Sequence, residues 1–163
     1  MGTLNDYRGR EHWSFSALNQ FLNICSLQFA FDRVYRLEKT FTPVALAFGS
    51  AFHRAMEWVH LTRKEGKMPQ ESEARDLFRD IWARQVREEK NIRFDEEAGA
   101  DLCGEQGANL VAAFLKAADP EERVLAVNEA FAVPLVDAWG NVLEKPLVGE
   151  IDCTVERGGE TML

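Results

Sequence analysis

Long apolar runs, a leader segment and paired cysteines are all missing from the 163-residue sequence. No apolar run approaches the roughly 20 residues that a membrane-spanning helix needs, so neither a transmembrane segment nor a membrane partner is predicted. The polar N-terminus lacks the apolar stretch of a secretory signal peptide. Cys25, Cys103 and Cys153 are an odd number without the spacing of a disulfide framework. Free thiols are typical of a reducing compartment, so a cytoplasmic protein is predicted.

The sequence also lacks the short motifs of several enzyme classes. It has no C-x-x-C, no H-E-x-x-H and no phosphate-binding glycine-rich motif, and no Ser-His-Asp set can be argued from spacing. Basic residues are outnumbered, because 19 Lys and Arg stand against 27 Asp and Glu, for a net charge of −8. This balance counts against a protein that simply coats DNA, which needs a basic patch. A nuclease site is a partial exception, since its carboxylates hold a divalent cation.

Apolar residues, by contrast, are abundant. They make up 46% of the chain, with eleven Phe and four Trp, which is enough for a core and argues against disorder. Their helical spacing predicts four helices in the first part of the chain. These are a helix capped by Ser14 or Ser16, residues 47–65 ending before Gly66, a helix after Pro69, and residues 95–118. Cys25 lies on the apolar stripe of the first helix, and all three thiols are expected in the core.

The period changes from helical to alternating near Arg123. Residues 123–135 and 147–157 alternate as strands do, and Gly158-Gly159 predicts a hairpin turn into a short third strand at 160–163. The predicted inward faces carry Leu125, Val127, Phe131 and Val133 in the first strand, and Leu147, Ile151, Cys153 and Val155 in the second. This order predicts an α+β fold, in which N-terminal helices precede the first strands of a mixed sheet that is incomplete at the C-terminus.

His53 is the first candidate for chemistry. It lies off the apolar stripe of its predicted helix, on a second stripe with Gly49, Met56 and His60. Gly49, one turn earlier, leaves room for a group to approach the imidazole closely. The more ordinary interpretation of His53 is a partly exposed helix histidine without a chemical role. We apply that interpretation to His60.

Two carboxylates in the strands are the other candidates. Asp152 sits in the middle of a strand, where Asp is disfavoured, and a rigid strand would hold it well for a hard cation. Glu150 and Glu156 share its face, so a solvent-facing residue is an equal alternative. Glu129 falls among apolar residues on the face expected to be buried, where a carboxylate needs a base or a metal. A structural ion pair is favoured for Glu129 over a metal contact, and a bulge that changes the register is a further alternative.

The order of these motifs resembles the RecB-like nucleases of the PD-(D/E)XK superfamily. The matching elements are Ser14-x-Ser16-x-Leu18, Cys25 followed by Phe29, Gly49-x-x-x-His53, Glu129-x-Phe131 and Gly149-x-Ile151-Asp152. The resemblance covers residues 14–163, with 1–13 as an N-terminal extension. It implies a restriction-endonuclease-like fold and hydrolysis of phosphodiester bonds in DNA repair or recombination.

The same resemblance implies the site and its partners. His53 and Asp152 correspond to ligands of a catalytic Mg²⁺ or Mn²⁺, and Glu129 corresponds to a frequent family glutamate, so these three are the predicted catalytic residues. The implied partners are single- or double-stranded DNA and a helicase subunit or domain. Cys25 matches one ligand of the iron–sulfur cluster of some members, but Ser26 replaces the usual proline, and such a cluster would need a longer chain.

One departure from the family pattern affects activity. No D/E-x-K and no Q-x-x-x-Y follows Asp152, so this fragment is expected to be inactive and its last strand to invite self-association. A RecB-like module that binds DNA or acts as a scaffold without catalysis is the alternative function. A third hypothesis is an unrelated α+β interaction domain.

Overall fold

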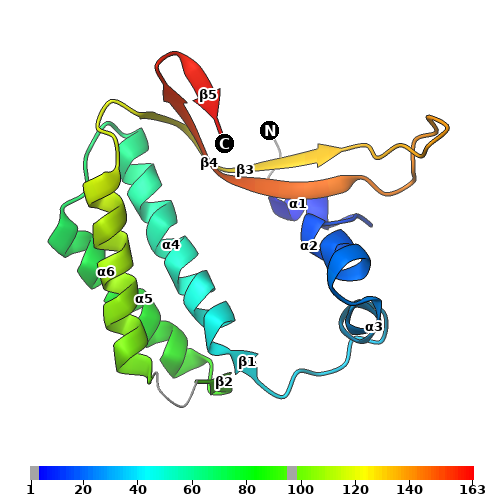
Figure 1. The fold of residues 1–163 in the computed structure, drawn as a ribbon, viewed down its shortest axis with the longest axis horizontal. Helices are drawn as coiled ribbons and strands as arrows, with labels where there is room; N and C mark the ends of the chain where they lie inside the picture. Colours follow the sequence, from blue (N-terminus) through cyan, green and yellow to red (C-terminus); the bar gives the residue numbers. More distant parts are fainter. Residues whose placement is uncertain (1–3, 95–98) are drawn as a thin grey trace. The chain divides into compact units, whose positions relative to one another are not determined.

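The computed structural model describes residues 4–94 and 99–163, which group by their contacts into two compact units. The helical unit comprises Lys39–Val127 and Cys153–Leu163, and the N-terminal unit comprises the chain up to Glu38 together with Asn128–Asp152. Two long strands, β3 (Arg123–Val133) and β4 (Leu147–Arg157), each pass from one unit into the other. Mixed helices and small sheets confirm the predicted α+β class, which is consistent with a restriction-endonuclease-like fold (Figure 1).

Three packed helices build the helical unit: α4 (Val44–Lys64), α5 (Glu71–Glu88) and α6 (Ala100–Ala117). Two short parallel strands, β1 (Thr42–Pro43) and β2 (Ile92–Arg93), precede α4 and follow α5. The core between the helices is centred on the fully buried side chains of Val59, Phe78 and Val111. Helix α4 begins three residues earlier than predicted, because Pro43 has a φ of −57° and ψ of 138° and so leads directly into the first helical turn.

The buried face of α6 contains small residues. Leu102 and Leu110 are 47% and 50% exposed, and the buried positions include Gly104 and Gly107. A Cβ at Gly107 would overlap the ring of Phe78, and a Cβ at Gly104 would lie 3.0 Å from Trp82 Cδ1. The two glycines therefore let the aromatic rings of α5 approach the α6 backbone. The predicted first residues of this helix, 95–98, lie outside the described residues.

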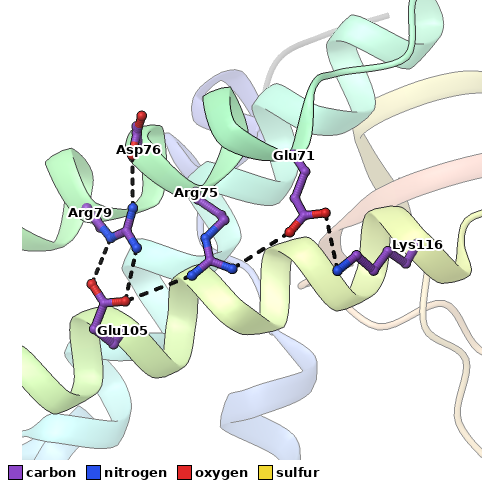
Figure 2. Close-up of polar contacts among 6 residues, drawn as sticks. All are labelled: Glu71, Arg75, Asp76, Arg79, Glu105 and Lys116. Atoms are coloured by element: carbon purple, nitrogen blue, oxygen red, sulfur yellow. Dashed lines mark hydrogen bonds and ion pairs between the residues drawn. The ribbon is translucent and has the colours of Figure 1, made fainter.

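A row of charged side chains joins α5 to α6 along their solvent-exposed sides, as Figure 2 shows. Arg79 donates to Asp76 at 2.9 Å and to both carboxylate oxygens of Glu105 at 2.8 and 2.9 Å. Glu71 pairs with Arg75 at 3.7 Å and with Lys116 at 3.2 Å. Hydrogen bonds from Arg79 lower the pKa of Glu105, so this carboxylate is held ionised by arginine.

The N-terminal unit begins with short helical pieces where one helix was predicted. These are α1 (Leu4–Arg8), α2 (Phe15–Asn19), the π-helix η1 (Gln20–Ile24), α3 (Ser26–Phe29) and the π-helix η2 (Ala30–Val34). Ser14, one of the two predicted capping residues, caps α2 by accepting a hydrogen bond from the Ala17 amide at 3.2 Å. The π-helical turns interrupt the 3.6-residue period on which the predicted stripe depends. Leu22 is consequently 69% exposed.

Cys25 corrects another expectation, because it is exposed and not part of the core. Its backbone is extended at φ −163°, which separates η1 from α3. Its sulfur caps α3 by accepting a hydrogen bond from the Gln28 amide at 3.5 Å. Cys103 is buried, as predicted, and Cys153 is half-buried.

The main sheet has the order β3-β4-β5, and β5 (Glu160–Met162) pairs antiparallel with the end of β4. The predicted hairpin and short third strand are thus confirmed. The predicted inward faces are wrong, since the buried residues of β3 are Val124 and Ala130 and those of β4 are Val148 and Thr154. Among the described residues, no helix is both long and apolar enough to span a membrane.

Candidate metal centre

Glu150 and Asp152 form a carboxylate pair on β4, within the N-terminal unit. They are two residues apart on an extended strand, so their side chains leave the same face of the sheet. One carboxylate oxygen of each lies within 4.8 Å of the other. Glu150 is half-buried and Asp152 is exposed. Two carboxylates at this separation on a rigid strand offer oxygen ligands of the kind that hard divalent cations prefer.

Packing within the N-terminal unit explains the glycine that precedes this pair. A Cβ on Gly149 would lie 2.5 Å from Cζ of Phe131, on the neighbouring strand β3. The absence of a side chain at Gly149 therefore makes room for the Phe131 ring. The Glu129-x-Phe131 and Gly149-x-Ile151-Asp152 motifs, 20 residues apart in the sequence, meet through this contact.

The start of β4 is also held by the segment that precedes α2. The amide of Trp13 donates to the carbonyl of Pro146 at 2.9 Å, and the amide of Val148 donates to the carbonyl of Trp13 at 2.8 Å. Trp13 and Leu147 thus form a parallel bridge at the start of β4. Lys145 lies 5.8 Å from the centre of the Trp13 ring and pairs with Glu11 at 2.8 Å. These contacts fix the backbone that carries Glu150 and Asp152.

His53 lies on α4 in the helical unit, and its side chain is exposed, as predicted. Burial of Ala47, Ala51, Ala55 and Val59, each at most 2% exposed, sets the rotation of α4 and leaves His53 off the core-facing side. A Cβ on Gly49 would meet nothing within 4 Å, so the space one turn before His53 is open. His60 is half-buried with its ring 5.4 Å from that of Phe114, which agrees with its structural interpretation.

Glu129 lies on the β3 part of the N-terminal unit and is half-buried. Among residues 4–94 and 99–163 it makes no ion pair, so the partner expected for it is not found there. The preceding residue, Asn128, has a φ of 53°, which breaks the extended conformation. This local break agrees with the alternative of a changed register at Glu129.

Glu150 was not selected from the sequence, although it stands two residues before Asp152. The signal that could have found it is the i, i+2 spacing of two acids on one strand face. Glu156, on the same face, differs from this pair because Arg123 donates to its Oε2 from Nε at 2.9 Å and from Nη2 at 2.6 Å. Position on the face alone therefore does not make a carboxylate a candidate ligand.

Comparison with known proteins gives the family. A family model described as the PD-(D/E)XK nuclease superfamily matches residues 12–163, which is nearly the whole chain. No curated protein and no solved structure matches the chain. Because the family model spans well over half of the sequence, the chain belongs to the PD-(D/E)XK nuclease superfamily.

Proposed function

We propose that this chain is a RecB-type nuclease domain that binds Mg²⁺ or Mn²⁺ through His53, Glu150 and Asp152 and acts on DNA in repair or recombination. The observation that carries the proposal is the Glu150–Asp152 pair at the Gly-x-Ile-Asp position of a chain in this superfamily. One imidazole nitrogen and two carboxylate oxygens suit these ions, and the nitrogen favours Mn²⁺. In this proposal Glu129 has no ligand role.

Such an ion would polarise a phosphoryl oxygen and lower the pKa of a bound water. The residues of the chain supply the geometry of its site. The Phe131–Gly149 contact and the Trp13 bridge hold Glu150 and Asp152 on a rigid strand, which limits the conformational entropy lost when both carboxylates bind the ion. His53 would contribute a neutral imidazole, and the open space beside Gly49 would admit the substrate.

The metal centre is tested by titrating the protein with Mn²⁺ and measuring free ion by electron paramagnetic resonance. H53A, E150Q and D152N are each expected to weaken Mn²⁺ binding by at least about tenfold, because even residues behind the ligands typically contribute that much. E156Q is the matched control, a carboxylate on the same strand face that Arg123 already occupies, and it should bind as the unmodified protein does. Unchanged affinity in H53A and D152N would show that the ligands are wrongly assigned.

No D/E-x-K follows Asp152 among these 163 residues, so we expect the chain to bind the ion without cleaving DNA. The alternative is a RecB-like module that binds DNA or acts as a scaffold and needs no ion. The Mn²⁺ titration separates the two, since a scaffold has no reason to lose metal affinity in D152N. An iron–sulfur cluster and a helicase partner are implied only by the resemblance to RecB-like nucleases. Cys25 is the one residue of this chain that matches a ligand of such a cluster.

We also propose that copies of the chain associate through β5. This three-residue strand pairs with β4 at Val155–Arg157 and forms the edge of its sheet. Unpaired backbone groups at a sheet edge favour pairing with a second chain. Light scattering at increasing concentration is expected to give a mass above that of one chain, 18.5 kDa. T161P should reduce the association, because proline removes an amide from the strand, and a monomer at high concentration would contradict it.

A further inference from the structure

The connection between β3 and β4 presents one aromatic ring to solvent. Trp139 is 86% exposed, more than any other tryptophan or phenylalanine of the described residues. It lies in the N-terminal unit, in the connection between β3 and β4, and β4 carries the Glu150–Asp152 pair. Figure 1 shows this connection. An indole can bury ~150–250 Å² against a partner, and nothing in its own unit covers this one.

The backbone that carries Trp139 is held by a single carboxylate. Oδ1 of Asp137 accepts hydrogen bonds from the amides of Trp139 and Asn141, both at 2.9 Å. Its Oδ2 accepts one from the Asn141 side chain, also at 2.9 Å, and this bond is the first cause of the lowered pKa of Asp137. Gly140, at φ 87°, supplies the left-handed residue that the turn requires.

The base of the turn is closed as well. The Asp137 amide donates to the Asn141 carbonyl at 2.9 Å, and the Leu143 amide donates to the Leu135 carbonyl at 2.8 Å. Val136 and Val142 form an antiparallel bridge between these bonds. The ring is therefore displayed on an ordered turn, so a ligand that covers it would not have to order a loop first.

We propose that Trp139 is a stacking platform for an unpaired base of a single-stranded nucleic acid. The choice of ligand rests on the proposed nuclease function. With a net charge of −8, the chain has little general attraction for a polyanion. Stacking on an aromatic face tolerates any base, and it needs a base whose face is open, which a duplex interior does not offer.

The proposal is tested by titrating the 163-residue chain with a fluorescent 12-nucleotide oligothymidine in EDTA. W139A is expected to bind about 5- to 150-fold more weakly, the range typical for loss of one stacked base. W139F keeps a ring and should stay within about threefold of the unmodified protein. F15A is the matched control, a 76% exposed aromatic in the same unit, and should leave affinity unchanged.

A second readout is the intrinsic fluorescence. Saturation with the oligonucleotide should quench the emission of the unmodified protein, and W139F should abolish this quenching, whereas a blunt duplex of equal length should not quench. Equal affinity of W139A and the unmodified protein, or no oligonucleotide binding at all, would overturn the proposal. The proposal would also be overturned if W139A changed the mass measured by light scattering but not the oligonucleotide affinity, because the ring would then contact a second copy of the chain.

The two tests fail independently. The oligonucleotide titration contains no metal ion, and the Mn²⁺ titration contains no nucleic acid. If the ligand variants bind Mn²⁺ as the unmodified protein does but W139A binds the oligonucleotide more weakly, the metal centre is contradicted and the stacking platform is supported. If the ligand variants bind Mn²⁺ more weakly but W139A binds the oligonucleotide as the unmodified protein does, the metal centre is supported and the stacking platform is contradicted.

Discussion

Replacing Arg63 with alanine is expected to lower the free energy of unfolding by about 3–5 kcal/mol, the usual cost of removing one partner from a buried ion pair. The Arg63 side chain is only 4% exposed at the end of α4. Its Nη1 lies 3.2 Å from Oε1 of Glu122, and its Nη2 donates to the Asp119 carbonyl at 3.0 Å. Arg157, at the end of β4, donates to Glu122 Oε2 at 2.6 Å. Removing Arg63 therefore removes the polar link between α4 and the segment from Asp119 to Glu122. It leaves the Glu122 carboxylate with Arg157 as its remaining partner.

Urea denaturation measures the free energy of unfolding of R63A, and R79A serves as the control in which an exposed arginine is replaced. Arg79 makes more ion-pair contacts than Arg63, but its side chain is 37% exposed and its partners are more exposed still (Figure 2). Exposed pairs contribute little, so R79A should be much less destabilised than R63A. R63M, which keeps an unbranched apolar side chain, should recover part of the loss if packing contributes. Equal stability of R63A and R79A would show that burial does not govern the cost at Arg63.

The same substitution, glycine to alanine, is expected to have opposite effects in two helices. G107A should lower the free energy of unfolding by about 2–3 kcal/mol, the upper part of the range for overpacking a core. The added methyl would overlap the Phe78 ring, which is fully buried. The backbone of α6 or the ring of α5 must then shift.

G49A should instead raise the free energy of unfolding by about 0.5–1 kcal/mol, the ordinary gain for alanine inside a helix. Gly49 is exposed within α4, and its Cβ would enter open space. Thermal unfolding followed by circular dichroism measures both variants under the same conditions. A stabilised G107A, or a strongly destabilised G49A, would contradict the packing described for these positions.

Local patterns determined much of the fold. Helical spacing located α4 and α5, alternation located β3 and β4, and Gly158-Gly159 located the turn before β5, because each depends on neighbours in the sequence. The same reasoning failed for features that depend on contacts between helices and strands. Helical spacing does not explain Gly104 and Gly107, because only their contacts with the rings of Trp82 and Phe78 require glycine there.

For the candidate metal centre too, some residues could be predicted from the sequence and others were found only in the structure. The sequence alone offered Asp152 as a candidate, because aspartate is disfavoured in a strand, and His53 as a candidate, because it lies off the apolar stripe near Gly49. The order of the motifs then gave both a role as metal ligands. Sequence reasoning passed over Glu150 and placed Cys25 in the core, since side-chain proximity and burial are properties of the packed chain. Burial on the Val148 and Thr154 face of β4, against the predicted inward face, was likewise decided by packing. Tertiary structure decided these points because the face of a strand that becomes buried depends on which elements pack against it.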